Sequence, residues 1–377
     1  MPKVVIVYRF LPQYRVPFYE GLRTRLREDG IDLELIYGDG DADDRAKRDL
    51  VSIDWGVAVP NRIVRLGSAG LYWQPVLDRV RSADLIIVEQ ASRLLLNYLL
   101  LFGQRLGGPR VALWGHGRNF QADGRHRVAE WVKAFASKHA HWWFAYNQRS
   151  ADVVAALGFP RSRISIVENA IDTTSLRTHV ASISASERAA MLRRWQLDGS
   201  RLGAYVGGLY KEKCIPFLLD AARLLRDHMP GFELLIAGDG PQRDLVREAA
   251  DRHAWVKVVG PTFGRDKAAL LAAAQVMLLP GAVGLAVLDA FAAGLPLATT
   301  NVPFHGPEIA YLTEQVTGIV TVHEPHAYAH GVAALFEDSA RLDRMRAAAL
   351  LASQRYTIEN MVERFAAGIR TALVSTA

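Results

Sequence analysis

The chain has 377 residues, half of them hydrophobic, with 45 Lys and Arg against 39 Asp and Glu. This is enough apolar material for two domains with substantial cores, and it excludes a disordered or low-complexity protein. The single cysteine, Cys214, cannot form an intrachain disulfide. A disulfide framework and a cysteine-based zinc cluster are therefore excluded, and a reducing, cytoplasmic compartment is expected.

Short hydrophobic runs alternate with longer helical patterns along almost the whole chain. The first run, 4–7, follows Met1 without a basic segment ahead of a long apolar core, so it predicts a strand and not a signal peptide. Two series of about five buried strands separated by helices predict an α/β protein with two doubly wound, Rossmann-like parallel-sheet domains. The predicted strands are 4–7, 33–36, 85–88, 111–114, 143–145, 202–206, 234–237, 256–259, 276–279 and 296–299.

The boundary between the two domains is predicted near 170–186. There a strand-like run, 164–167, ends and a polar stretch rich in Ser and Thr follows. Residues 1–170 then form the first domain and 171–355 the second, and a hinge at the boundary would place a cleft between them. A C-terminal helix at about 356–377 is expected to pack back on the first domain; its apolar side chains at helical spacing are Met361, Phe365 and Ile369.

The whole net charge of +6 lies in the first domain, because residues 1–170 carry 24 basic and 18 acidic side chains and the remainder carries 21 of each. Such an excess is either solvated surface charge or a field that attracts phosphates or an anionic membrane. Nucleic acid is not expected as a partner, since the basic residues are scattered and match no nucleic-acid-binding motif. The basic residues of first interest are Arg25, Arg27, Arg125, Arg127, Lys133 and Lys138.

Two segments of the first domain bear on membrane contact. The longest apolar stretch, 94–102, is interrupted by Asn97 and has about half of the roughly 20 residues that a membrane-spanning helix needs. The segment 125–143 carries apolar side chains at helical spacing among basic ones. It is either a core-packing helix or a basic amphipathic surface that rests on anionic lipid.

Glycine turns follow two predicted strands of the second domain. In the first turn Gly207 and Gly208 end a strand, and Lys213 precedes a helix. Glycines let a phosphate approach the backbone, and a lysine adds a point charge, although such a turn on its own is structural as often as not. The second turn, 238–240, superficially suggests a dinucleotide fingerprint but lacks the third glycine, so NAD binding is not expected.

These turns, together with Glu168-Asn169-Ala170-Ile171-Asp172 and the run 280–296, resemble in order and spacing the motifs of retaining GT-B glycosyltransferases of family 4. The resemblance is strong from about 167 to 318 and weaker through Trp114-Gly115-His116-Gly117. It implies two Rossmann-like domains that face a central cleft. It also implies a retaining transfer of a sugar from a nucleotide diphosphate sugar to a hydroxyl acceptor, without a cofactor or metal.

The resemblance assigns the donor to the second domain. It implies that Lys213 binds the diphosphate and that Asp289, where the family has a Glu, accepts hydrogen bonds from ribose hydroxyls. Gly208 stands where an Arg usually accompanies the lysine, so one cationic contact is missing. Gly207 and Gly260 complete these donor residues.

Gly281 stands where the family has the first Glu of a Glu-x7-Glu motif, which contacts sugar hydroxyls. Its absence implies a donor with different hydroxyl demands, or recognition by the backbone amides of Val283, Gly284 and Leu285 at a helix N-terminus. The alternative is that Gly281 only makes a turn and that activity has been lost.

Two residues are expected to be catalytic. His116 follows an apolar strand where the family has a His beside the donor sugar, although lone histidines are often structural. Lys213 would place positive charge where negative charge develops on the leaving diphosphate of an oxocarbenium-like transition state. The acceptor or cleft residues are expected to be Gln13, Tyr14, Arg15, Arg118, His305 and Glu308.

Several of these assignments have structural alternatives. Arg15 or Arg118 would either replace the missing cationic contact or be a surface or structural arginine. His305 is either a substrate contact or a turn residue, and Glu308 is equally explained as an acid in the first turn of a helix. The acidic run 39–44 contains the D-x-D pattern with which GT-A enzymes bind a divalent metal, but it is more typical of a solvated loop, so no metal site is expected.

Similarity to bacterial family members implies a role in surface polysaccharide synthesis, with a glycan or lipid-linked acceptor at the inner face of the cell membrane. Glycolipid and small-molecule acceptors stay open, and no residue names the donor sugar. Two other functions are compatible with the sequence. One is a nucleotide-sugar epimerase of the same architecture, and the other is a catalytically inactive nucleotide-binding subunit, motivated by Gly208 and Gly281.

Overall fold

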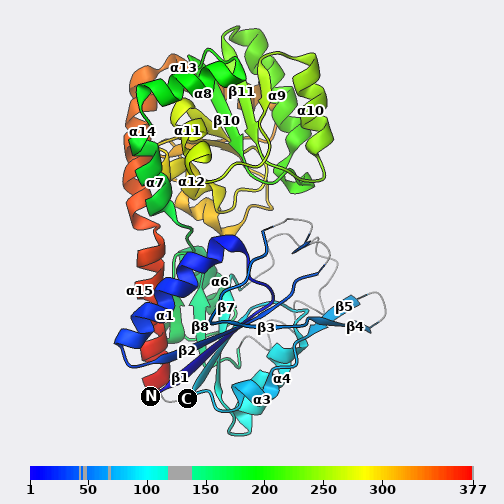
Figure 1. The fold of residues 1–377 in the computed structure, drawn as a ribbon, viewed down its shortest axis with the longest axis vertical. Helices are drawn as coiled ribbons and strands as arrows, with labels where there is room; N and C mark the ends of the chain where they lie inside the picture. Colours follow the sequence, from blue (N-terminus) through cyan, green and yellow to red (C-terminus); the bar gives the residue numbers. More distant parts are fainter. Residues whose placement is uncertain (42–43, 46–48, 67–68, 118–137, 376–377) are drawn as a thin grey trace. The chain divides into compact units, whose positions relative to one another are not determined.

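The computed structural model describes residues 1–377 apart from 42–43, 46–48, 67–68, 118–137 and 376–377. The chain divides into two compact units, each built on its own parallel sheet (Figure 1). Unit 1 comprises Met1–Ile171 and Ile358–Ala377, and unit 2 comprises Asp172–Thr357. This division lies next to the boundary expected from the sequence at residue 170.

Unit 1 contains a sheet of seven parallel strands in the order β3-β2-β1-β6-β7-β8-β9. Val4 of β1, for example, is in register with Leu33 of β2 on one side and with Leu85 of β6 on the other. The order reverses between β1 and β6, so the carboxyl ends of these strands flank the point where doubly wound sheets bind ligands. The strands are β1 Lys3–Tyr8, β2 Asp32–Gly38, β3 Val57–Val59, β6 Leu85–Glu89, β7 Arg110–Gly115, β8 Trp142–Ala145 and β9 Ile164–Ile166.

In the described part of unit 1, the remaining elements are helices around this sheet and an antiparallel hairpin of β4 and β5. They are η1 Gln13–Arg15, α1 Val16–Glu28, β4 Arg62–Leu66, β5 Ala69–Trp73, α3 Leu77–Val80, α4 Leu95–Arg105, α6 Gln148–Ala156, η2 Arg161–Arg163 and α15 Ile358–Val374.

The C-terminal helix α15 completes the core of unit 1. Phe365, one of the apolar side chains at helical spacing, stacks on Phe144 of β8 with ring centroids 4.2 Å apart. The same ring also contacts Phe18 of α1 and Trp114 of β7. At the surface, Arg25 of α1 pairs with Glu363 at 2.8 Å. A segment more than 180 residues away in sequence is thus needed to close this core.

Unit 2 contains six parallel strands in the order β12-β11-β10-β13-β14-β15, with the reversal between β10 and β13. Its strands are β10 Arg201–Val206, β11 Phe232–Ala237, β12 Val256–Val258, β13 Val276–Leu278, β14 Leu297–Thr300 and β15 Gly318–Thr321. Its helices are α7 Thr173–Ser182, α8 Ala185–Trp195, η3 Lys211–Lys213, α9 Ile215–His228, α10 Arg243–Arg252, α11 Gly264–Ala273, α12 Ala286–Ala292, η4 Pro307–Tyr311, α13 Pro325–Glu337 and α14 Ser339–Arg355.

The predicted fold class of two doubly wound parallel-sheet domains is confirmed, and each predicted run forms a strand within one or two residues of its expected ends. Among the described residues, four strands were not predicted. β3 and β15 have only three and four residues at sheet edges, and β4 and β5 form a hairpin outside both main sheets. Short edge strands and two-stranded ribbons lack the long buried runs that make central parallel strands visible in a sequence.

The stacking of Phe365 predicts that α15 contributes strongly to the stability of unit 1. Replacing Phe365 by Ala should lower the free energy of unfolding by about 3–5 kcal/mol, because it leaves a cavity among aromatic rings that cannot collapse freely. Urea denaturation followed by tryptophan fluorescence would measure the change. Val374→Ala, at the exposed end of the same helix, serves as the control and should change stability little. Equal stability of the Phe365 variant and the wild type would contradict this account of the core.

Candidate functional site

The two turns assigned to the donor follow β10 and β13, the strands on either side of the reversal in unit 2. They are in direct contact, because the Ala282 amide donates to the Glu212 carbonyl at 2.7 Å. In the opposite direction the Lys213 ammonium donates to the Ala282 carbonyl at 2.6 Å. A lysine therefore lies between the two turns at the carboxyl edge of the sheet, the usual place for a ligand in this architecture.

Gly281 is a glycine because the first turn approaches its backbone closely. A Cβ at this position would overlap the carbonyl oxygen of Glu212 and would lie 2.6 Å from that of Lys213. Both atoms belong to the backbone and cannot move aside as a flexible side chain would. A glutamate at 281 is thus incompatible with the observed contact between the turns.

The Lys213 ammonium is partly buried beside acidic groups. Burial lowers the pKa of Lys213, whereas the nearby charges of Glu308 and Glu212 act in the opposite direction. Glu308 is itself buried, in the first turn of η4. The interpretation of Glu308 as an acid in the first turn of a helix agrees with this position, while its burial beside Lys213 also makes it part of the charged surroundings of the site.

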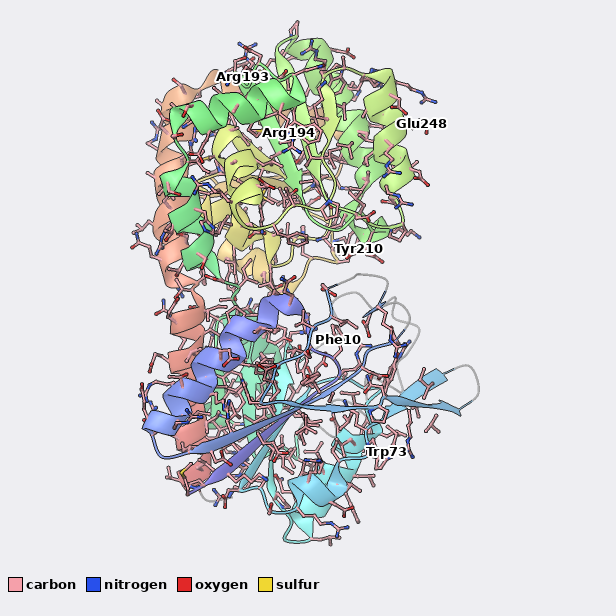
Figure 2. The ribbon with its side chains drawn as sticks, in the orientation of Figure 1. Phe10, Trp73, Arg193, Arg194, Tyr210 and Glu248 are labelled. Atoms are coloured by element: carbon pink, nitrogen blue, oxygen red, sulfur yellow. The ribbon has the colours of Figure 1, made fainter. Side chains whose placement is uncertain are left out.

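Gly208 leaves room for an aromatic ring. Its Cβ would overlap the ring of Tyr210, which lies on the loop after β10 (Figure 2). The hydroxyl of Tyr205 donates to the Gly208 carbonyl at 2.6 Å and holds the turn to β10. Gly238 of the second turn packs on the first, since its Cβ would overlap the Gly207 carbonyl oxygen. The glycines at 207, 208 and 238 thus allow dense packing of turns and not only access to a ligand.

Gly260 lies at the carboxyl end of β12, at the edge of a cavity of about 650 Å³. Its carbonyl accepts from the Gly238 amide at 2.9 Å, and its φ of 75° is in the left-handed region that favours glycine. The cavity is also lined by Asp239 and by Arg194, the latter labelled in Figure 2. Gly260 is therefore adjacent to the glycine turns but further along the sheet than Lys213.

His305 connects two backbone segments of unit 2 by hydrogen bonds. Its Nδ1 accepts from the Val283 amide at 3.0 Å, so Nε2 carries the proton and donates to the Thr300 carbonyl at 2.6 Å. The ring is buried and both nitrogens are engaged, which agrees with the interpretation of His305 as a turn residue, while a contact with substrate stays a prediction. The same bond engages the Val283 amide, which was one of the amides expected to donate to substrate.

Asp289 of α12 is buried and forms an ion pair with Lys267 of α11, with Nζ 2.6 Å from Oδ1. The lysine holds the carboxylate in place while a carboxylate can accept further hydrogen bonds. Lys267 was missed by the sequence analysis, because the two residues belong to different helices and no local pattern connects them. Gly284 and Leu285 precede α12 beside this pair.

In unit 1, His116 follows β7 on a turn fixed by Gln90. The Gln90 side chain accepts from the Gly117 amide at 2.8 Å and donates to the Gly117 carbonyl at 3.1 Å. A Cβ at Gly117 would lie 2.8 Å from a methyl group of Val154 in α6, so the turn also packs tightly on that helix. The His116 ring lies 5.3 Å from that of Tyr146. Gln90 was missed, although its position directly after a buried strand was a signal.

Arg15 lies inside unit 1 and is 1% exposed. Its guanidinium carbon is 4.9 Å from the Trp114 ring and 5.1 Å from that of Tyr14, which are cation–π distances. These contacts agree with the interpretation of Arg15 as a structural arginine, because its charge lies against aromatic rings of its own unit, and a contact with a donor phosphate stays a prediction. Gln13 and Tyr14 are exposed on η1, whereas Arg118 lies outside the described residues.

A second charged group lies at the reversal point of unit 1. Glu89 ends β6, and burial raises the pKa of its carboxyl while Arg9, just after β1, lowers it. Arg9 in turn binds Asp44 at 2.6 and 3.0 Å and Asp41 at 3.3 Å. Sequence analysis missed Glu89, which is an acidic residue at the end of a buried aliphatic run.

Arg9 accounts for part of the acidic run 39–44, because it binds two of its carboxylates, those of Asp41 and Asp44. Burial alone would raise the pKa of Asp41, but hydrogen bonds from the Tyr72 hydroxyl and the Asp44 backbone and the charge of Arg9 lower it to about 2. Among the residues that the structure describes, no group of three or more His, Cys, Asp or Glu side chains could hold a metal ion. Asp43 and most of the segment 125–143 lie outside the described residues.

Two family models match the chain in separate parts. The model of Glycosyltransferase Family 4 matches residues 19–175, and that of Glycosyl transferases group 1 matches residues 201–338. The chain belongs to glycosyltransferase family 4.

Similar proteins of known name agree with this membership. A glycogen synthase of Mycobacterium tuberculosis is 28% identical over 272 residues, which cover 66% of this chain but only 59% of that protein. A GDP-mannose-dependent alpha-(1-6)-phosphatidylinositol dimannoside mannosyltransferase of the same species is 28% identical over 281 residues, 68% of this chain and 66% of that one. The crystal structure of Anabaena Alr3699/HepE in complex with UDP covers 98% of this chain and 100% of its own, with a TM-score of 0.74 and 16% identity. At this identity the likeness shows the GT-B fold alone.

In this family 4 glycosyltransferase, each of the two departures from the family motifs is closely packed. The Cβ of Gly208 would meet the ring of Tyr210 in its own turn, whereas the Cβ of Gly281 would meet the backbone of residues 212–213 in the other turn. Lys213 is the cation that remains at the contact between the turns.

This packing predicts that alanine destabilises the protein at Gly281 but changes its stability little at the nearby Gly284. Gly281→Ala should destabilise the protein by about 1–3 kcal/mol or more, because its Cβ meets backbone atoms that have no room to move. Gly284→Ala is the matched control, since no atom lies within 4 Å of its Cβ, and it should change the melting temperature little. Differential scanning calorimetry of both variants measures the effect. Equal melting temperatures would contradict the observed contact.

Proposed function

We propose that this glycosyltransferase moves a sugar from a nucleotide diphosphate sugar to a hydroxyl acceptor with retention of anomeric configuration. The observation that carries the proposal is the position of Lys213 between the two turns at the reversal of the unit 2 sheet. Anabaena Alr3699/HepE, similar in fold, is described in complexes with UDP and with UDP-glucose. Unit 2 is accordingly proposed as the donor-binding unit and unit 1 as the acceptor-binding unit.

Lys213 is the proposed ligand of the donor diphosphate. Its ammonium donates to the neutral Ala282 carbonyl, which is a weaker partner than a phosphate oxygen. Burial lowers the pKa of Lys213, and an adjacent diphosphate would raise it and keep the ammonium charged. Because the lysine already supplies a cation at this point, the reaction is proposed to need no metal.

Asp289 is the proposed ligand of the ribose hydroxyls. Its ion pair with Lys267 fixes the carboxylate before the donor binds, so little side-chain freedom would be lost on binding. The amides of Gly284 and Leu285 are proposed as further donors to the substrate, without that of Val283, which is engaged with His305. A donor bound in this way would be held mainly by backbone amides and by two charged side chains, those of Lys213 and Asp289.

Bond cleavage is proposed to depend on charge at the leaving group. As the bond between the sugar and the diphosphate breaks, negative charge grows on the phosphate oxygen, where the Lys213 ammonium would stabilise it. Attack by the acceptor hydroxyl on the same face of the sugar would give retention. His116, on the turn held by Gln90, is proposed to form a hydrogen bond with the donor sugar.

The proposed acceptor is a glycan or lipid-linked oligosaccharide of bacterial surface polysaccharide synthesis, met at the inner face of the cell membrane. The name of one relative, a mannosyltransferase that acts on phosphatidylinositol dimannoside, supports a lipid-linked acceptor. The basic excess of residues 1–170 supports an anionic surface as a partner.

A second candidate function, an inactive nucleotide-binding subunit, is favoured by one observation. Gly281 has no room for the acidic side chain that the family uses at this position. Such a subunit would bind nucleotide but would neither transfer nor hydrolyse the donor sugar. Product formation with retained configuration, followed by NMR of the anomeric proton, distinguishes the two functions.

The donor site is tested by nucleotide binding. UDP, GDP, TDP and CDP, each with and without Mg²⁺, are titrated by calorimetry and thermal shift into the wild type, Lys213→Met and Lys211→Met. We expect one diphosphate to bind without Mg²⁺ and Lys213→Met to weaken it by about 10- to 100-fold, since a charge-assisted hydrogen bond is lost. The control residue Lys211 lies on the same turn but is exposed, and its variant should bind as the wild type does. Binding unaffected by Lys213→Met, or no binding at all, would overturn the assignment.

A further inference from the structure

Helix α4 of unit 1 is apolar on both its buried and its exposed face. Its buried residues, which include Leu96 and Leu100, pack on the sheet. At 100° per residue, four other large apolar side chains fall within about 60° of one another on the opposite side. They are Leu95, Leu99, Phe102 and, just after the helix, Leu106.

This second stripe is open to solvent. Leu99, Phe102 and Leu106 are 49%, 63% and 75% exposed. Isolated exposed hydrophobic residues are normal in soluble proteins, but a continuous stripe on one helix face indicates a partner surface. The stripe plays no part in the donor site, which lies in unit 2.

The β4–β5 hairpin lies against the same helix. The Tyr72 amide of β5 donates to the Arg93 carbonyl at 2.8 Å, and Tyr72 forms a bridge with Leu94 just before α4. In β4, Ile63 and Val64 are 56% and 42% exposed. Trp73, labelled in Figure 2, ends β5 and is partly buried. The hairpin therefore adds exposed aliphatic side chains, on alternate faces of β4, next to the N-terminal end of α4.

The charges on these two segments all have one sign. Residues 57–73 and 90–106 contain four arginines and no Asp or Glu. Those whose side chains the structure describes, Arg62, Arg93 and Arg105, are exposed. An apolar surface with arginines at its border is complementary to an anionic bilayer, because the apolar residues enter the acyl boundary and the arginines remain among the headgroup phosphates.

We propose that α4 and the β4–β5 hairpin form an interfacial docking surface for an anionic lipid bilayer. The helix lies on the bilayer and does not cross it. Eleven helical residues extend only about 16 Å, roughly half of the hydrocarbon thickness. None of the helices in the described part of the chain combines the length and the hydropathy needed for a span.

A bilayer contact through α4 and the hairpin would bring unit 1 to a lipid-linked acceptor. This inference rests on the proposed function. It assigns membrane contact to residues that the sequence analysis considered only as a stretch too short to span a membrane. The basic segment 125–143, which the sequence analysis singled out, is not required.

The test is sedimentation of the full chain with vesicles, in the absence of donor and acceptor. Vesicles of phosphatidylcholine alone are compared with vesicles that contain about one third phosphatidylglycerol. We expect the wild type to bind the anionic vesicles preferentially and to be released as salt rises from about 0.1 to 1 M. Phe102→Ser with Leu106→Ser should lower the partition coefficient at least about tenfold. Arg93→Gln with Arg105→Gln should reduce binding and its dependence on salt.

The matched control is Leu351→Ser with Val322→Ser, which removes two exposed apolar side chains from unit 2, and it should bind vesicles as the wild type does. Melting temperatures of all variants exclude unfolding as the cause of a loss. Equal binding by the Phe102/Leu106 variant and the wild type would overturn the proposal. So would a change of oligomeric state in that variant without an effect on vesicles, which would identify a second copy of the chain as the occupant. Because no nucleotide is present, failure here is distinct from failure of the donor site.

Discussion

The contact between the turns after β10 and β13 is the constraint on which the proposed donor site depends. The backbone of residues 212–213 lies so close to Gly281 that only a glycine fits, and the Ala282 amide and carbonyl are joined to Glu212 and Lys213. This contact brings a cation to the reversal point of the sheet and at the same time excludes the acid that the family has at this position. A single packing requirement thus explains both what the site retains and what it lacks.

The carboxyl edge of the sheet in unit 1 is arranged differently from that in unit 2. Charged and polar groups follow the strands at its reversal point, with Arg9 after β1 and Glu89 and Gln90 at the end of β6. They are held by burial and by partners within the unit, as Arg15 is by aromatic rings and Gln90 by the Gly117 backbone. The exposed apolar side chains of the proposed membrane surface lie elsewhere in this unit, on α4 and the hairpin. Its proposed roles in acceptor binding and in membrane contact therefore involve different surfaces.

The sequence predicted the fold well and the site in part. Buried aliphatic runs made the central strands visible, and glycine turns after strands located Lys213, whereas the edge strands were too short to be recognised. The parts that could not be predicted have a common cause: they depend on contacts between residues distant in sequence. The sequence left open whether Arg15 is a phosphate ligand or a structural arginine, because no local pattern shows that Trp114, almost 100 residues away, lies against it. Likewise, the partner of Asp289 on another helix and the backbone that covers Gly281 appear only when the chain is folded.

The most direct test of the central claim is hydrogen–deuterium exchange of the full chain with and without the nucleoside diphosphate that binds it. If the two turns form the donor site, protection should appear in peptides that contain residues 207–214 and 281–289, since a bound diphosphate orders these backbones and covers their amides. Protection should be greatest there among the peptides of unit 2. Protection confined to unit 1, or saturable binding without a change in either turn, would contradict the claim.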